Sequence, residues 1–502
     1  MNITMLLDMS AEAFGDRVAI SHDGTRVTFA ELQALALGAA EVVRASGASH
    51  LAFLDVNSQA TAVALFGAAH AAVPYVPLNY RLTDEELEAL LGRVAPALLV
   101  VGPEAEGRIQ PREGLTLMKR ADFLAAAEAA AGAASTAAED PATIAVQLFT
   151  SGTTGAPKAA VLRHENLSAY IIGTVEFGAA EETDANLVSV PPYHIAGISA
   201  ILSSTYAARR MATIGAFEPQ AWVRACRAES ASNAFVVPTM LSRIIDVLDG
   251  EGGAGLPSLR AIAYGGGRMP QATIERAMQL LPQVDFTNAY GLTETSSTVA
   301  VLGPDDHRHA IASDDPKIRR RLSSAGQPTG AVEIQIRDED NTVLGPEEAG
   351  LVFVRGPQVS GEYLSLGSQL DAEGWFPTRD RGFLDAEGYL YLDGRADDVI
   401  VRGGENISPG EVEDVLLAHP AVADAAVVAV PDDQWGEGVG AAVVLIPGQA
   451  VSAEVLQDLV RSQLRSSRVP QVIRFYDALP YNEMGKVLRR VIRDDLAEPV
   501  PA

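Results

Sequence analysis

An alternation of apolar runs with helix-compatible segments, from His50 to Gly102, constrains the fold more than any other feature of this chain. Strands that are apolar along their whole length and separated by helices are typical of parallel βαβ units, in which helices cover both faces of the sheet. The same alternation recurs from Leu187 to Met240. In the first block the predicted strands are Leu51–Val56, Val73–Leu78 and Ala97–Val101, and the predicted helices are Ala60–Ala72 and Thr83–Leu91. The larger part of the chain is therefore predicted to be α/β.

From Val332 onward the sequence consists of short β-like runs separated by turn signals, which indicates a small β module behind the α/β body. The segment after Arg395 is long enough for a small α+β domain. We predict an N-terminal domain over residues 1–396 and a small mobile C-terminal domain over residues 397–502. The alanine-rich stretch Ala125–Asp140 is interpreted as a surface helix or a connector. The predicted C-terminal elements are the helices Pro409–Ala418 and Ala453–Leu464 and the strands Ala425–Val430 and Gly440–Leu445.

The charge balance excludes one class of function. The 502 residues include 38 Lys plus Arg against 65 Asp plus Glu, for a formal net charge of −27. Binding to a phosphate backbone needs clustered cations, which this surplus of carboxylates would oppose, so we expect no nucleic-acid partner. With 48% hydrophobic residues the chain is globular rather than disordered. At roughly 150 residues per domain, its length predicts more than one domain.

Lysine and cysteine are both rare. The single cysteine, Cys226, excludes an intramolecular disulfide framework and a Cys-rich zinc site, and it is interpreted as an ordinary helix residue. The first ten residues do not resemble a secretory signal, and no apolar run approaches the ~18 residues that cross a bilayer. We therefore expect a cytoplasmic protein without a membrane span. Only four of the cations are lysines, and each needs an explanation: Lys119, Lys158, Lys317 and Lys486.

The strongest local motif is the segment from Thr150 to Lys158, which follows the apolar strand Ile144–Phe149. Its glycines let backbone N–H groups approach an anion, its hydroxyls add donors and its lysine adds a point charge. It is not a Walker A loop, because Ala156 and Pro157 separate Gly155 from the lysine. We interpret it as a phosphate-binding loop, in preference to a generic polar surface loop. Its predicted contact residues are Thr150, Ser151, Gly152, Thr153, Thr154, Gly155 and Lys158.

A second motif offers a site for a flat ring beside phosphates. The glycine run Gly265, Gly266 and Gly267 leaves an open backbone surface, although three glycines alone are more often a turn. In the segment Asn288, Ala289, Tyr290 and Gly291, the tyrosine is able to stack on a ring and the asparagine to hydrogen-bond an exocyclic amine. Thr293 and Glu294 follow with a hydroxyl and a hard carboxylate, the ligand types that Mg²⁺ prefers beside phosphates.

Together these motifs make the chain similar to the adenylate-forming superfamily, and within it to the acyl-CoA synthetases. The motifs run from Thr150 to Lys486, and Thr28–Leu91 also fits the opening region of that family, so the resemblance covers nearly the whole chain. It implies that a carboxylic acid and ATP form an acyl-adenylate and pyrophosphate, after which coenzyme A takes the acyl group and AMP leaves. ATP, Mg²⁺ and coenzyme A are the implied cofactors.

The resemblance also implies residue roles. Lys486 is the adenylation lysine, and Lys158, Thr293, Glu294 and Arg395 join it in catalysis, with Glu294 as the metal ligand. Gly265–Gly267 and Asn288–Gly291 hold adenine, and Asp380 binds the ribose. Asp397 is the hinge between the domains. The acyl pocket is expected at His194, Ile195, Gly197, Val237 and Pro238, and the coenzyme A tunnel at Gly403, Gly404, Glu405 and Trp435.

Several interpretations stay open at this stage. Ala159 and Arg379 stand where the family usually has glycine, which leaves the local geometry of phosphate and ribose binding to be determined. His194 is either an acyl-pocket residue, which its motif favours, or an ordinary packed histidine. The pocket segments are small and aliphatic, which favours an uncharged acyl chain or ring of medium or specialised type. Four arginines fit either coenzyme A phosphates or a solvated face: Arg461, Arg465, Arg468 and Arg474.

Two alternatives compete with the acyl-CoA synthetase. The first is an acyl-AMP ligase that loads a carrier protein; the absence of a carrier domain and the Trp435-Gly436 pair favour free coenzyme A over it. The second is a non-catalytic nucleotide-binding homologue, against which the presence of both Lys486 and Glu294 argues. The sequence leaves the oligomeric state open, with a homodimer among the options, and it does not name the acid.

Overall fold

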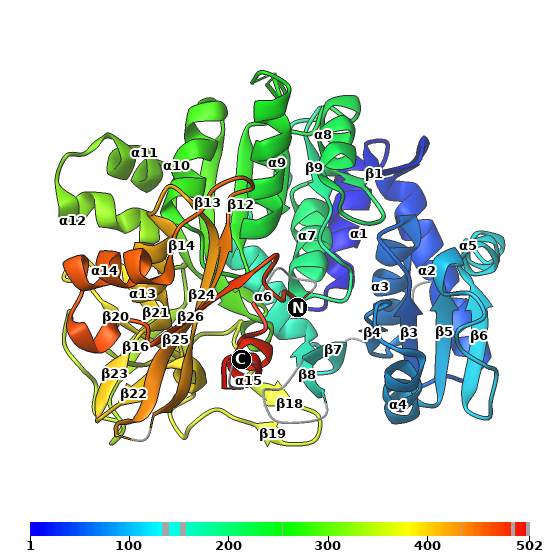
Figure 1. The fold of residues 1–502 in the computed structure, drawn as a ribbon. Coiled ribbons are helices and arrows are strands. Elements are labelled where there is room, and N and C mark those ends of the chain that lie inside the picture. The colour runs from blue at the N-terminus through cyan, green and yellow to red at the C-terminus, as the bar shows by residue number, and fades with distance from the viewer. Residues whose placement is uncertain (133–139, 151–156, 254, 433, 483–486, 498–502) are drawn as a thin grey trace.

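A computed structural model of the chain describes residues 1–132, 140–150, 157–253, 255–432, 434–482 and 487–497. It is a mixed α/β structure with a large N-terminal part and a small C-terminal part, as the sequence predicts (Figure 1). Among the helices of these ranges, none has the length and apolar character to cross a membrane.

An eight-stranded sheet contains the first predicted βαβ block. Strands β7, β4, β3, β5 and β6 pair in parallel, and a helix connects β3 to β4 and another connects β4 to β5, as parallel pairing requires of a crossover. The far edge is antiparallel, which the sequence pattern did not predict. In spatial order the strands are β19 (Gly367–Ser368), β18 (Glu362–Tyr363), β8 (Lys158–Arg163), β7 (Ile144–Thr150), β4 (Tyr75–Pro77), β3 (His50–Leu54), β5 (Ala97–Val101) and β6 (Leu115–Lys119).

A nine-stranded sheet contains the second block. Its centre is parallel and both of its ends are antiparallel. In spatial order the strands are β15 (Gln327–Pro328), β14 (Ser297–Leu302), β13 (Asp285–Leu292), β12 (Ala261–Gly265), β11 (Asn233–Val236), β9 (Ala185–Val188), β10 (Arg210–Thr213), β1 (Val18–His22) and β2 (Thr25–Thr28).

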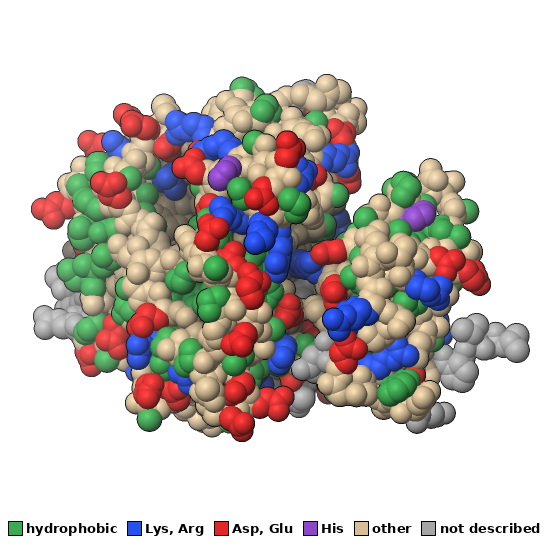
Figure 2. Space-filling model, turned by 90° about the vertical axis from the view of Figure 1, so that its left-hand side faces the viewer, with side chains coloured by type: hydrophobic (Ala, Val, Ile, Leu, Met, Phe, Trp, Pro, Cys, Tyr) green, Lys and Arg blue, Asp and Glu red, His purple; other side chains and the backbone are tan. Residues whose placement is uncertain are grey.

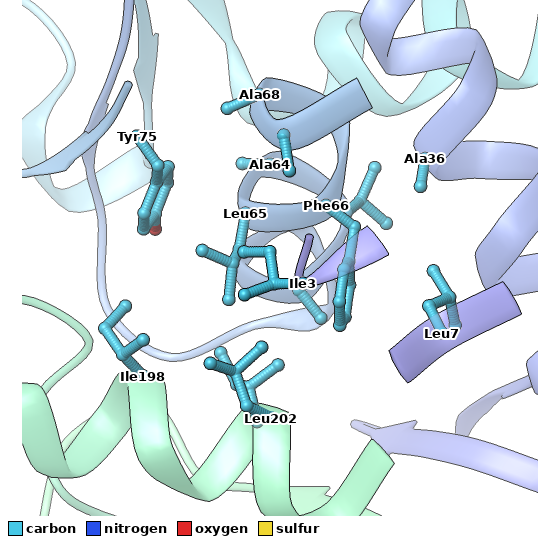
Figure 3. Packing of buried hydrophobic residues seen from close by; sticks show 14 of the residues in the cluster. Ile3, Leu7, Ala36, Ala64, Leu65, Phe66, Ala68, Tyr75, Ile198 and Leu202 are labelled. Atoms are coloured by element: carbon cyan, nitrogen blue, oxygen red, sulfur yellow. The ribbon is translucent and has the colours of Figure 1, made fainter. Parts of the chain in front are cut away.

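Helices between the two sheets form the main core. Nearly every side chain of α3 (Gln59–Ala71) is buried, because this helix packs among other helices and both sheets (Figure 1). Figure 3 shows Leu65 and Phe66 of α3 beside Ile3, Ile198 and Leu202, which come from the N-terminus and α7. The helices of the N-terminal part are α1 (Thr4–Phe14), α2 (Phe29–Ser46), α3, α4 (Asp84–Val94), α5 (Arg120–Ala129), α6 (His164–Thr174), α7 (Ile195–Tyr206), α8 (Pro219–Ala228), α9 (Pro238–Gly250), α10 (Gln271–Leu280), α11 (Pro304–Ala312) and α12 (Pro316–Arg319).

A four-stranded antiparallel sheet forms the small β module that the sequence predicts. Its own buried cluster includes Val352, Val354 and Phe376. The strands, in spatial order, are β16 (Glu333–Arg337), β17 (Gly350–Arg355), β20 (Phe376–Leu384) and β21 (Leu390–Arg395). Cys226 lies buried in α8, and burial raises the pKa of its thiol to about 12, which agrees with an inert helix residue.

The C-terminal part has its own core. Two buried clusters contain only residues from Ile400 onward. Its helices and strands match the predicted ones closely, and the division of the chain near Asp397 stays a prediction. The strands are β22 (Ile400–Arg402), β23 (Glu405–Ile407), β24 (Val422–Asp432), β25 (Gly436–Leu445) and β26 (Val472–Tyr476), and the helices are α13 (Pro409–Leu417), α14 (Ala453–Gln463) and α15 (Arg489–Ala497).

Candidate functional site

The predicted phosphate-binding loop connects two paired strands. Thr150 ends β7 and Lys158 begins β8, and the two residues are register partners. The Thr150 hydroxyl donates to the Lys158 carbonyl oxygen at 3.3 Å, which closes the base of the loop. The residues between them that were assigned to phosphate binding, Ser151 to Gly155, lie outside the described residues.

Glu294, Tyr363 and Lys158 come together beside that base. The Tyr363 hydroxyl donates to Oε1 of Glu294 at 2.5 Å, and Nζ of Lys158 lies 5.6 Å from the centre of the Tyr363 ring. Burial, reinforced by the Glu294 carboxylate, raises the pKa of Tyr363, so its phenol stays protonated and continues to donate. The Glu294 residue is only 8% exposed, and Thr293 starts the short helical turn that carries it. Tyr363 thus contacts the Glu294 carboxylate through its hydroxyl and lies near the Lys158 ammonium group through its ring.

The glycine run follows β12 directly. A Cβ on Gly265 would lie 2.2 Å from the Ala289 carbonyl oxygen, so close strand packing requires glycine there. Gly266 has a φ of +79°, and it is exposed together with Gly267, so this part of the backbone is open, and its contact with adenine stays a prediction. On the neighbouring strand, the Asn288 side-chain amide donates to the Ser324 carbonyl oxygen at 2.8 Å, which leaves its own carbonyl oxygen as an acceptor.

Asp380 forms a hydrogen bond and an ion pair with two residues to which the sequence analysis gave other roles. The Tyr290 hydroxyl donates to Oδ2 of Asp380 at 2.5 Å, and Nε of Arg395 lies 3.2 Å from Oδ1. Arg395 also donates to the Thr378 carbonyl oxygen at 2.8 Å. Burial lowers the pKa of Arg395, but Asp380, Tyr290 and Glu294 outweigh that effect and raise it. Asp380, Arg395 and Glu294 therefore share one electrostatic environment.

Ala159 and Arg379, which stand where the family usually has glycine, differ in the backbone strain that they cause. Ala159 is buried in β8 and its methyl group causes no distortion of the strand pairing. Arg379 has a φ of +63°, in the left-handed region where an L-residue with a side chain is strained. Its side chain is exposed, and its charge reaches Tyr363, whose pKa it lowers against the larger effect of burial.

The predicted acyl-pocket residues lie at the starts of two helices next to the glycine run. His194 is the residue before α7, which contains Ile195 and Gly197, and Val237 and Pro238 begin α9. Built Cβ atoms on Gly266 and Gly267 would contact Val237 and Pro238 at 3.5 and 3.8 Å, so α9 and the glycine run are neighbours. Burial lowers the pKa of His194 to about 3, so its imidazole is neutral at physiological pH. Its buried Nε2 atom has no hydrogen-bond partner among the described residues.

The residues assigned to coenzyme A lie apart from this cluster, on the C-terminal part. Gly403 donates its N–H to the Trp435 carbonyl oxygen at 3.1 Å, and a Cβ on Gly403 would lie 2.6 Å from the Trp435 ring. Gly404 has a φ of +86°, and Glu405 forms an ion pair with Arg468. Asp397, the predicted hinge residue, is exposed in a short turn after Arg395.

Other residues that the sequence singled out either lie outside the described residues or have partners elsewhere. Lys486 lies outside the described residues. Lys119 pairs with Glu106 at 2.7 Å and so has a structural use. All four C-terminal arginines lie within ion-pair distance of an acidic side chain of the protein itself, including Arg465, whose Nη1 is 3.8 Å from Oε1 of Glu405.

Sequence reasoning missed Tyr363 completely. It lies 69 positions from Glu294 in the sequence, on the short edge strand β18, and no local pattern identifies it. The described site thus combines a fixed carboxylate, a lysine at the base of a glycine-rich loop, an open glycine surface and a neutral buried imidazole. Such a set can bind a nucleotide with its phosphates and hold a small acid beside them.

Comparison with known families and proteins agrees with this arrangement. A family model described as AMP-binding enzyme matches residues 7–364, and one described as AMP-binding enzyme C-terminal domain matches residues 411–486. A fatty acid–[acyl-carrier-protein] ligase, ScoC, from Streptomyces coeruleorubidus is 32% identical over 95% of this chain and 93% of its own length. A feruloyl-CoA synthase from an Amycolatopsis species is 31% identical, over 95% of both chains.

Solved structures match the fold over almost its full length. The o-succinylbenzoate CoA synthetase MenE from Bacillus subtilis, in complex with the acyl-adenylate intermediate OSB-AMP, has a TM-score of 0.81 at 29% identity and covers 97% of this chain and 98% of its own. ATP-bound MatB from Rhodopseudomonas palustris has a TM-score of 0.88 at 26% identity, with 99% of both chains covered. The chain belongs to the AMP-binding enzyme family, and with it to the adenylate-forming superfamily of acid–thiol ligases.

Proposed function

We propose that this protein is an ATP-dependent acyl-CoA synthetase acting on a small, largely uncharged carboxylic acid. In the first half-reaction an oxygen of the acid attacks the α-phosphorus of ATP, and the bond to pyrophosphate breaks. In the second, the thiolate of coenzyme A attacks the carbonyl carbon of the acyl-adenylate, and AMP leaves. Activation is needed because a free carboxylate has no adequate leaving group.

The observation that carries this proposal is the cluster of Glu294, Tyr363 and Lys158. Two anions must meet in the first half-reaction, so the main task of the site is to neutralise and position charge. Tyr363 holds Oε1 of Glu294, which orients the carboxylate for a cation. Mg²⁺ prefers one or two carboxylates plus phosphate oxygens, which fits this single buried carboxylate, and it would neutralise phosphate charge there.

Neighbouring residues complete the binding of the nucleotide. The fixed amide of Asn288 presents its carbonyl oxygen toward an exocyclic amine, and the glycine run supplies a flat surface. Asp380, oriented by Tyr290 and Arg395, is assigned to the ribose hydroxyls. Lys486 is assigned to the reacting carboxylate and α-phosphate, since an ammonium group on a flexible stem suits a cation that a second domain delivers.

The acid is assigned to the space between α7 and α9. Val237 and Met240 are buried apolar residues at the start of α9, and the neutral His194 adds one polar atom, Nε2, with no hydrogen-bond partner among the described residues. This combination favours an acyl chain or ring with one polar group over a diacid. The names of the relatives differ in the acyl acceptor. ScoC is named for a carrier protein, whereas the feruloyl-CoA synthase and a 2-succinylbenzoate–CoA ligase are named for coenzyme A.

The test is an ATP–pyrophosphate exchange screen over a library of carboxylic acids. Exchange with a small set of apolar or aromatic acids is the expected result. Each active acid is then offered with coenzyme A or with a phosphopantetheinylated carrier protein, and thioester formation is measured for both. Exchange followed by transfer only to the carrier would replace the coenzyme A assignment by the carrier-protein ligase. ATP binding without exchange for any acid would indicate the non-catalytic nucleotide-binding homologue.

A further inference from the structure

Arg268 connects the nucleotide site to the small C-terminal part. It directly follows the glycine run Gly265–Gly267, in the link between β12 and α10. Its guanidinium group donates to the carboxylate of Asp414 on α13 and forms an ion pair with it. One residue after the nucleotide-binding backbone thus makes a direct contact with the other part of the molecule.

Gly410 makes this contact sterically possible. It lies one turn before Asp414 on α13, and a Cβ built on it would be 1.9 Å from Nη1 of Arg268. The guanidinium group therefore lies directly against the backbone of α13. The contact thus combines two opposite charges with a glycine, one turn before Asp414, that leaves room for the guanidinium group.

A second contact and a cleft lie beside this pair. The Ser408 hydroxyl donates to the Asp393 carbonyl oxygen at 2.6 Å, at the start of α13. Next to it lies a cleft of about 750 Å³, which Arg268, Ser408 and Asp414 line together with residues of β20, β21 and the α12 region. On the face that carries α12 and α14, basic and acidic side chains gather around a hollow (Figure 2). Since a cleft separates much of α13 from the N-terminal part, each direct contact matters more.

The orientation of the small part seen here suits the first half-reaction. Trp435 is 46% exposed and Gly403 and Gly404 are exposed as well, so three of the residues assigned to coenzyme A face solvent. Arg489, three residues after Lys486, has its Nε 3.8 Å from Asp398, whose charge in turn acts on Arg395 in the nucleotide site. Arg489 therefore lies beside the turn that directly follows Arg395.

We propose that the Arg268–Asp414 pair is a positioning latch that holds the small domain in the orientation for adenylation. Because Arg268 adjoins the glycine run, the latch couples the backbone that binds the nucleotide to the domain that delivers Lys486. This inference rests on the proposed function. Arg268 and Asp414 are positioning residues, because they neither contact the substrate nor take part in proton transfer. Their effect is confined to one orientation of the domains.

The kinetic test compares the two half-reactions in Arg268→Ala and Asp414→Ala. Exposed ion pairs contribute up to about 1 kcal/mol, so pyrophosphate exchange should fall about three-fold to five-fold. Thioester formation from supplied acyl-adenylate should not fall, since it uses a different orientation. The exchanged pair Arg268→Asp with Asp414→Arg should recover most of the exchange rate. An equal loss in both half-reactions, or no recovery in the exchanged pair, would overturn the latch.

Gly410→Ala is a second variant, in which the stability of α13 should not fall whereas the rate of pyrophosphate exchange should. Alanine is the better helix former, so on propensity alone it should not destabilise α13. Its Cβ would force the guanidinium end of Arg268 to shift, so pyrophosphate exchange should fall, by up to the loss seen in Arg268→Ala. The matched control is Arg276→Ala on α10, which removes ion pairs to Asp246 and Asp249 within the N-terminal part. In Arg276→Ala, the ratio of the pyrophosphate-exchange rate to the thioester-formation rate should equal that of the parent protein.

A distance measurement tests the latch without any activity. Spin labels are placed at Asp305→Cys and Arg465→Cys, two highly exposed positions on opposite sides of the contact. Cys226 is buried and has a thiol pKa of about 12, so it should not be labelled. A narrow distance distribution that broadens in Arg268→Ala supports the latch, and an unchanged distribution contradicts it. If no acid gives exchange, the proposed function fails while this measurement still decides on the latch.

Discussion

At the level of single residues, the Tyr363 hydroxyl determines how Glu294 presents its carboxylate. It occupies Oε1 and leaves the other oxygen for a cation. Tyr363→Phe removes this bond, and because hydrogen bonds to charged groups contribute about 1.5–3 kcal/mol, the Mg²⁺ concentration for half-maximal pyrophosphate exchange should rise about ten-fold. Tyr389→Phe is the control, since it removes a similar bond to Asp306 on the other side of the β module. An equal Mg²⁺ dependence in both variants would contradict the role of Tyr363.

Arg379 carries backbone strain inside the site. Its left-handed φ of +63° suits glycine, so Arg379→Gly should raise the free energy of unfolding by about 1 kcal/mol. Arg381 lies two residues further on the same strand without a positive φ, and Arg381→Gly should lower it, since glycine weakens a strand interior. Chemical denaturation of both variants measures the difference. A destabilised Arg379→Gly protein would show that the arginine contributes contacts that outweigh the strain.

His164 should make stability depend on pH. It is buried, and burial, followed by the N-terminal amine, lowers its pKa to about 4 from the ordinary 6.5. Between these values the unfolded chain binds the extra proton, so the free energy of unfolding falls as the pH falls, by up to ~1.4 kcal/mol per pH unit. His164→Gln should flatten this slope between pH 6 and pH 4.5 in denaturation curves. His309→Gln, which removes an exposed imidazole, should leave the slope as it is.

At the level of elements, the start of α4 shows how local sequence determines a helix end. The Thr83 hydroxyl accepts from the Glu86 N–H at 3.3 Å, and the Glu86 carboxylate accepts from the Thr83 N–H at 2.8 Å. Thr83→Ala should lower the free energy of unfolding by about 1 kcal/mol, because the Glu86 N–H at the start of the helix loses its acceptor. Thr83→Ser keeps the cap and should stay close to the parent. Equal losses in both variants would mean that the methyl group, not the cap, matters.

Elements also show where local pattern stops being informative. The parallel strands β3, β4 and β5 are recognisable because each is a short apolar run between helices, and both faces of the sheet are buried. The edge strands β18 and β19 have two residues each and no such pattern. They exist because β8 offers a free edge for pairing, which is a property of the assembled sheet.

At the scale of the whole molecule, the site needs both parts of the chain. Lys486 is assigned to adenylation and belongs to the C-terminal part, whereas Glu294 and Lys158 belong to the N-terminal part. Lys486→Ala should reduce pyrophosphate exchange about 100-fold or more, as for the loss of one group that stabilises transition-state charge. Thioester formation from supplied acyl-adenylate should persist. The control is Lys317→Ala, at the one lysine to which no role is assigned, and it should leave both half-reactions unchanged. An exchange rate in Lys486→Ala equal to that of the parent protein would contradict the role given to Lys486.

The sequence by itself determined the parts of this protein that depend on neighbours along the chain. The βαβ blocks, the helix starts, the glycine run and the loop that ends at Lys158 all follow from residue types at short spacing, and their resemblance to the adenylate-forming family followed from these motifs. Only the tertiary structure decided which distant side chains meet. It placed Tyr363 on Glu294, Tyr290 on Asp380 and Arg268 on Asp414, contacts that span 69, 90 and 146 positions of the sequence. The physical reason is that such pairs depend on how sheets and domains pack, and no local preference of either residue encodes that.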